Sequence, residues 1–182
     1  MENYDYVGKY SEGLIRFKIG VFPYFKCGFI DITNKVVIPP IYSNVRDFHN
    51  GLARAKIGNW SSGKWGFINT SGELVIDFLF DKPRRFSDGY AKVVLNGEWC
   101  FINLKGEKVI SLKDYDGGSS FHHGYAIVAK KKSDNYGYLY GIIDKNGNEV
   151  VPCEVDSYEK RKYFDCGSLK HCIKLYNSGY YE

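Results

Sequence analysis

Short stretches of alternating apolar and polar residues recur along this chain, separated by glycine-containing turns. Residues 53–57 alternate alanine and isoleucine with arginine and lysine, residues 91–96 again place apolar residues at every second position, and residues 15–19 follow the same period. Such alternation, with one apolar side, is typical of a half-buried β-strand. Because no stretch sustains the 3.6-residue period of an amphipathic helix, the pattern predicts an all-β protein.

The expected strands belong to a unit that occurs four times. Each unit starts with an aromatic residue that is followed three positions later by glycine, and successive starts are 38, 38 and 35 residues apart. Agreement across four copies indicates tandem repetition. The starting pairs are Tyr10 and Gly13, Phe48 and Gly51, Phe86 and Gly89, and Phe121 and Gly124.

A second block of sequence lies further along each unit and is clearest at Trp65, Gly66 and the Phe-Ile pair that follows. The two large aromatic residues share one face of a strand, and the glycine between them leaves room for an element packed on the other face. We expect Trp65, Trp99 and Gly66 to be structural residues, with both tryptophans in the core between repeats. The block begins at Cys27, Trp65, Trp99 and Tyr140.

A tight turn follows this block in every copy. It begins with Asp or Asn, whose side chain can hydrogen-bond the backbone, and its fourth position must tolerate a left-handed conformation. The sequence therefore predicts a hairpin built from a type I turn and a glycine bulge, with a third strand after it. The residues at the left-handed position are Asn34, Gly72, Gly106 and Gly147.

We expect a single repeat domain over residues 1–182, made of tandem three-stranded antiparallel units. One unit is too small to bury its apolar face alone, so neighbouring units must pack together. The sequence favours a curved, solenoid-like array and leaves open a closed, propeller-like ring. The expected repeats span residues 10–47, 48–85, 86–120 and 121–157, with a truncated fifth repeat or cap at 158–182.

The complete unit resembles the WG-repeat family, also called KWG. The shared pattern is an aromatic residue, glycine three positions later, a β-run, Trp-Gly-Phe-Ile, a glycine turn and Val-Ile-Pro, and it extends over residues 10–157. The resemblance implies a bacterial or bacteriophage-like origin, a β-rich architecture and an interaction role without enzymatic activity. The chain departs from the pattern at Cys27 and Tyr140, which replace Trp, and at Cys100, which replaces Gly. We therefore expect the packing role of these family positions in this chain, but not a role that requires Trp in every repeat.

Composition and charge narrow the functional classes. The sixteen Tyr, twelve Phe and twenty Gly suit pleated sheets and tight turns. The net charge of +4 is far below that of a typical nucleic-acid-binding domain. The N-terminus lacks the basic and apolar regions of a signal peptide, and no run is long enough for a transmembrane helix, so we expect a cytoplasmic protein. Five cysteines without paired spacing indicate reduced thiols.

Motifs for catalysis are weak. A nucleophile needs a nearby base and an orienting group, yet the sequence has neither a Gly-x-Ser-x-Gly elbow nor a phosphate-cradling loop before a helix. The Asp and Asn residues that recur at turns are explained by the turns themselves. We therefore expect no catalytic residue, no cofactor and no enzymatic activity.

A zinc site is the alternative use for the C-terminal cysteines. The right ligand types occur close together, but without the Cys-x-x-Cys or His-x-x-x-His spacing of zinc sites. We expect no bound metal. The residues considered are Cys153, Cys166, His171 and Cys172.

The remaining candidates lie in loops and connectors. Trp60, in the Gly/Ser-rich loop 58–63, either contacts a partner or folds back on its own hairpin. Basic clusters could contact an anion, although acidic residues adjoin two of them. A third basic cluster occupies residues 160–162. The candidate contact residues are Trp60, Arg84, Arg85, Lys130, Lys131 and Lys132.

These observations favour a non-catalytic binding or scaffolding module that engages another protein through its loops and connectors. The alternative is a protein that sequesters a small ligand or nucleotide in a pocket between units, and an enzyme is the third hypothesis. A cleft lined by convergent Arg and Tyr would favour the ligand, and a broad exposed aromatic patch would favour the protein partner. A small anionic ligand is compatible with the basic clusters, whereas nucleic acid and membrane are not expected partners.

Overall fold

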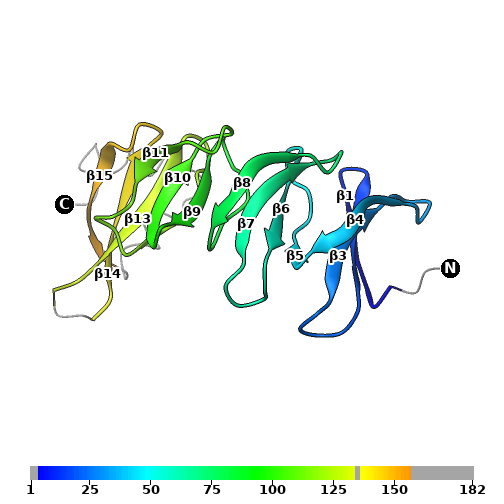
Figure 1. Ribbon diagram of the computed structural model, residues 1–182. Coiled ribbons are helices and arrows are strands. Elements are labelled where there is room, and N and C mark those ends of the chain that lie inside the picture. The colour runs from blue at the N-terminus through cyan, green and yellow to red at the C-terminus, as the bar shows by residue number, and fades with distance from the viewer. Residues whose placement is uncertain (1–3, 134–135, 157–182) are drawn as a thin grey trace. The chain divides into compact units, whose positions relative to one another are not determined.

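The computed structural model describes residues 4–133 and 136–156, and all regular elements in this part of the chain are β-strands (Figure 1). These strands form four separate antiparallel sheets, each a meander of strands that are consecutive in sequence. The predicted all-β class and tandem organisation are therefore confirmed. The proposed fifth repeat at 158–182 and the basic cluster at 160–162 lie outside the described residues.

The first two sheets have four strands each, in sequence order. The first contains β1 (Tyr6–Ser11), β2 (Leu14–Ile19), β3 (Lys26–Ile30) and β4 (Val36–Tyr42). The second contains β5 (Asn44–Val45), β6 (Leu52–Ile57), β7 (Lys64–Asn69) and β8 (Leu74–Phe80).

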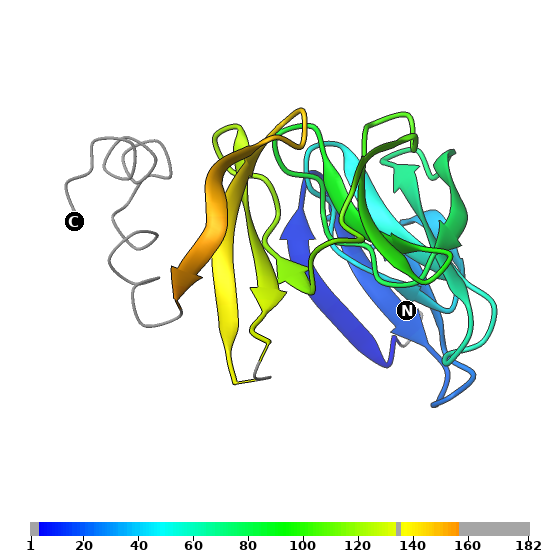
Figure 2. The same cartoon turned by 90° about the vertical axis from the view of Figure 1, so that its left-hand side faces the viewer.

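The other two sheets continue the pattern. In Figure 2 the strands β13, β14 and β15 of the last sheet lie side by side in yellow to orange. The third sheet contains β9 (Ala91–Leu95), β10 (Glu98–Ile102) and β11 (Lys108–Ser111). The fourth contains β12 (Gly117–Gly118), β13 (Tyr125–Lys131), β14 (Tyr138–Asp144) and β15 (Glu149–Asp156).

The expected three strands per repeat are joined by a fourth strand in three of the sheets. In the second and fourth sheets this edge strand comes from the connector, where Asn44 and Val45 pair with β6 and the two residues of β12 pair with β13. A pairing of two residues is too short to produce a detectable alternation, which is why the sequence predicted an irregular connector. The connector is thus part of the sheet.

The turn after the second strand has the predicted geometry. The amide of Gly72 donates to the carbonyl of Asn69 over 2.9 Å. The amides of Ser71 and Glu73 donate to Oδ1 of Asn69 at 3.0 and 2.9 Å. The left-handed position is confirmed in all four copies, with φ of 68° at Asn34, 84° at Gly72, 82° at Gly106 and 85° at Gly147.

The glycine at the start of each repeat belongs to a different turn. In the second copy Asn50 and Gly51 both have positive φ, 54° and 77°, between the bridged residues His49 and Leu52. Two consecutive positive φ values define the two-residue turn that suits the twist of a β-hairpin. The same pair of conformations occurs at Glu12 and Gly13, Asp88 and Gly89, and His123 and Gly124.

Gly66 is required by a close backbone approach. A Cβ there would lie 2.5 Å from the carbonyl oxygen of Ile76, where the register of β7 and β8 shifts. Cys100 takes the equivalent place in the third copy, and there the register runs without a shift from Cys100 to Phe101. The absence of an irregularity at that point of β10 accounts for a side chain where the other copies have glycine.

The buried core between successive repeats is built from phenylalanine. The second-strand Phe of one repeat packs against the aromatic residue that starts the next, with ring centroids 4.8 Å apart for Phe29 and Phe48 and 4.6 Å apart for Phe101 and Phe121. Phe67 and Phe86 form the same contact at 4.9 Å. These rings are almost fully buried, and together with aliphatic residues such as Ile38 and Val45 they form the apolar core that holds adjacent repeats together.

The chain divides into two compact units. The first contains residues up to Phe86 together with 93–97 and 104–106, and the second contains 87–92, 98–103 and the residues from Glu107 onward. The choice between a curved array and a closed ring depends on the placement of such units and stays a prediction.

Candidate binding surfaces

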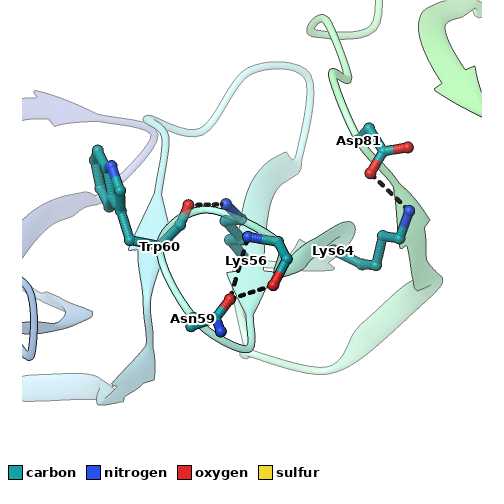
Figure 3. A network of polar contacts seen from close by, with 6 residues as sticks. Lys56, Asn59, Trp60, Lys64 and Asp81 are labelled. Carbon is teal, nitrogen blue, oxygen red and sulfur yellow. Dashed lines mark hydrogen bonds and ion pairs between the residues drawn. The ribbon is translucent and has the colours of Figure 1, made fainter. Parts of the chain in front are cut away.

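The loop that carries Trp60 is held in shape by polar contacts (Figure 3). Nζ of Lys56 donates to the carbonyl of Trp60 over 2.5 Å, and the amide of Ser62 donates to Oδ1 of Asn59 over 3.1 Å. The amide of Gly63 donates to the carbonyl of Asn59 over 2.9 Å. Directly after the loop, at the start of β7, Lys64 forms an ion pair with Asp81 at 2.6 Å. These contacts fix the backbone of the loop, so Trp60 is displayed by an ordered turn.

Trp60 packs against aromatic residues of the preceding hairpin loop and not against its own hairpin alone. Its ring centroid lies 5.8 Å from Phe22 and 5.5 Å from Phe25, both in edge-on contacts. Trp60 nevertheless remains 44% exposed, and Tyr24, which directly precedes Phe25 in the same loop, is 82% exposed. We refer to Phe22, Tyr24, Phe25 and Trp60 as the aromatic loop surface. It is formed within the first unit.

A second surface feature of the first unit is a pocket of about 330 Å³ that we call the arginine pocket. Its arginines come from strands β2 and β6 and from the connectors after β5 and β8. Among the described residues that line it, Asp47 is the single acidic side chain. The lining residues are Ser11, Arg16, Arg46, Asp47, Phe48, His49, Arg54 and Arg85.

Two of these arginines have different surroundings. Arg16 forms an ion pair in which its Nε lies 2.7 Å from Oδ1 of Asp47, although the N–H is not aligned for a hydrogen bond. Arg54 donates from Nη1 to the carbonyl of Pro83 over 2.8 Å and forms no ion pair with any described residue. Burial, followed by the charges of neighbouring arginines, lowers the pKa of Arg54 to about 10.

The predicted basic cluster at Lys130 to Lys132 does not form a free cationic patch. Lys130 lies 3.4 Å from Glu149 and stacks over Tyr115 with 4.9 Å to the ring centroid, and Lys132 is paired with Asp156. Two of the three charges are therefore neutralised locally. The cluster belongs to the second unit, whereas Arg84 and Arg85 belong to the first, so no common site of the two clusters is described.

Trp65 and Trp99 are half-buried and so are less buried than core residues usually are, although Trp99 packs against the core cluster that contains Phe101 and Phe121. Nζ of Lys92 lies 4.6 Å from the centroid of Trp99, and Lys56 lies 6.0 Å from Trp65. These distances are those of cation–π contacts. The tryptophans cover the buried stems of lysines on the neighbouring strand, while the phenylalanine two positions later enters the core.

The cysteines of the described region are buried, unpaired thiols, in agreement with the sequence analysis. Burial raises the pKa of Cys27, Cys100 and Cys153. Within the described ranges no three His, Cys, Asp or Glu side chains gather in a group that could hold a metal. Three of the residues considered for zinc, Cys166, His171 and Cys172, lie outside the described residues.

Sequence reasoning found Trp60 and Arg85 but missed the rest of the arginine pocket. In the sequence, Arg16 and Arg54 occupy polar positions of alternating strands, and Arg46 and Asp47 lie in the connector before Phe48. A comparison of equivalent positions between copies would have given the signal, because Asp47 and Arg85 both directly precede the aromatic residue of the next repeat.

None of the described residues forms a helix with the length and apolar character needed to cross a membrane. No curated protein matches the chain. The family described as WG containing repeat matches residues 28–59, 65–99, 101–132 and 140–160, which together make up more than half of the sequence. The chain therefore belongs to the family of WG-containing repeats.

Proposed function

We propose that this chain is a non-catalytic binding module that engages another protein through the loops of its hairpins. The observation that carries the proposal is the aromatic loop surface, where Phe22, Tyr24 and Trp60 are all substantially exposed. Contiguous exposed aromatic side chains are typical of protein interaction sites, and Trp and Tyr are enriched among the residues that dominate binding energy.

The ordered loop of Trp60 supports the same role. The Lys56 bond to the Trp60 carbonyl fixes the loop before any partner arrives. A preformed surface loses less conformational entropy on association than a flexible one. Tyr and Trp also have few rotatable bonds, so their ordering costs little.

A cytoplasmic setting in a bacterium or a bacteriophage-infected cell is part of the proposal. The WG-repeat family supports the source. The unpaired thiols of Cys27, Cys100 and Cys153 support a reducing compartment, because disulfides are rare there.

Site-specific photo-crosslinking in the native host tests the proposal. A benzophenone side chain replaces Tyr24 in one variant and Tyr10 in the other. Tyr10 is 61% exposed and lies next to the β1–β2 turn. The loop that carries Tyr24 is at the other end of β2, so Tyr10 is a matched control. We expect a discrete crosslinked protein from position 24 and none from position 10. Equal crosslinking at both positions, or none at position 24, would contradict the proposal.

A further inference from the structure

The arginine pocket gathers positive charge from two consecutive repeats without a matching number of acids. Four guanidinium groups face the single carboxylate of Asp47 across a volume of about 330 Å³. Arginines that converge in this way repel one another unless an anion lies between them. The pocket is separate from the aromatic loop surface, and the inference does not depend on the proposed protein partner.

Comparison of equivalent positions shows which counter-charge is missing. Arg16 and Arg54 each lie three residues after the glycine that starts their repeat. Asp47 and Arg85 each directly precede the aromatic residue that starts the following repeat. The first copy therefore pairs arginine with an acid, at 2.7 Å, whereas the second copy has a second arginine where the acid would be.

Arg54 and His49 each have an incomplete set of interactions at this site. Arg54 has the carbonyl of Pro83 as a neutral acceptor but no ion pair among the described residues. Nδ1 of His49, which also lines the pocket, is buried and has no hydrogen-bond partner in the described part of the chain. An oxyanion would supply acceptor oxygens to both groups. Burial, followed by the charges of neighbouring arginines, lowers the pKa of Arg54, and such a perturbation is often found at binding sites.

We propose that the arginine pocket binds a small phosphate-bearing molecule, with Arg54 and Arg85 as its main ligands. A planar guanidinium group binds phosphate oxygens through two parallel hydrogen bonds. A phosphoryl group, with its double negative charge, neutralises several arginines better than a single carboxylate does. The pocket volume lies at the lower end of the range for small-molecule sites, which suits pyrophosphate or a nucleotide phosphate.

Calorimetric titration of the full chain with pyrophosphate, ADP, adenosine and acetate at fixed ionic strength tests the proposal. We expect pyrophosphate and ADP to bind, and adenosine and acetate to give no saturable heat. Tighter binding of ADP than of pyrophosphate would identify a nucleotide as the source of the phosphate, and equal affinity would identify the free anion. Failure of both phosphate compounds to bind, or equal binding of acetate, would overturn the proposal.

The variant Arg85→Asp distinguishes a binding role from a structural one. It recreates at Arg54 the ion pair that Asp47 gives to Arg16, so folding should be retained while the phosphate site is lost. We expect affinity for pyrophosphate to fall by about tenfold or more, and pyrophosphate no longer to raise the thermal midpoint. The matched control is Lys113→Asp, which reverses an exposed charge of the second unit and should bind as the parent does. Unchanged affinity in Arg85→Asp would overturn the assignment.

Discussion

At the scale of single residues, the turns of this chain are determined by conformations that only certain side chains adopt. Gly106 has φ of 82°, and a Cβ at that position would lie 2.7 Å from Cγ2 of Ile76. Gly89 has a similar φ of 85° with open space around it. Substitutions at these two glycines therefore distinguish the cost of a left-handed backbone from the cost of a side-chain clash.

Replacing Gly106 with Val should therefore destabilise the protein more than replacing Gly89 with Ala. The left-handed conformation alone costs about 1–2 kcal/mol for a residue with a Cβ, and the contact with Ile76 adds to this in Gly106→Val. Urea denaturation of both variants measures the difference. Equal losses would show that the Ile76 contact relaxes freely, and an unchanged midpoint in Gly106→Val would contradict the turn assignment.

The buried thiols give a second test at this scale. Burial raises the pKa of Cys27, Cys100 and Cys153, so little thiolate forms in the folded protein at neutral pH. Because the folded-state pKa is raised, the stability linked to these thiols is present below their unfolded pKa and is lost at higher pH. We expect slow alkylation by iodoacetamide at pH 8, mapped by peptide mass spectrometry, and fast alkylation in denaturant. Rapid native modification at one of them would show it to be accessible.

At the scale of elements, adjacent repeats are joined by a phenylalanine of the second strand and the aromatic residue that starts the next repeat. Phe101 is almost fully buried against Phe121, while Trp99 is half-buried and covers Lys92. Trp99 thus covers Lys92 and packs against the core cluster from a half-buried position, whereas Phe101 forms the fully buried contact with the next repeat.

Truncation of these side chains should follow burial and not ring size. We expect Phe101→Ala to lose about 3–5 kcal/mol of unfolding free energy, the range for a buried aromatic residue. Trp99→Ala should lose clearly less, and Trp60→Ala less than about 0.5 kcal/mol, as for a surface substitution. Chemical denaturation of the three variants checks this order. A larger loss for Trp99→Ala than for Phe101→Ala would reverse the assignment.

The fold was predictable because every repeat has the same alternation of apolar and polar residues and the same turn residues at the same spacing. The left-handed positions at Asn34 and Gly72 follow from residue type and spacing alone. The half-burial of Trp65 was not predictable, because period-two alternation identifies a face without saying how deeply each side chain is covered. The arginine pocket was missed for a similar reason: Arg16 and Arg54 look like ordinary solvent-facing positions until the fold brings two connectors beside them.

At the scale of the whole molecule, the same hydrogen bond between successive repeats occurs in both compact units. In the first unit Oγ of Ser11 donates to the carbonyl of Phe48 over 2.6 Å, and Ser87 and Phe121 repeat this bond at 2.6 Å in the second. The equivalent position holds His49 in the second copy and His122 in the fourth.

The metal content of the intact chain tests whether its cysteines bind zinc. Cys153 is a buried thiol whose Sγ donates to the carbonyl of Leu139 over 3.1 Å. We expect elemental analysis of protein purified without added metal to give well below one zinc per chain. One tightly held equivalent would show that Cys166, His171 and Cys172 form a site.

The central claim, that the chain binds a protein partner through the aromatic loop surface, is tested most directly by native mass spectrometry of complexes purified from the host. We predict that the parent chain carries a stoichiometric protein partner, that Trp60→Ala loses it without a change in thermal midpoint, and that Tyr10→Ala retains it. A parent chain that purifies alone, or a partner retained at full occupancy by Trp60→Ala, would contradict the account.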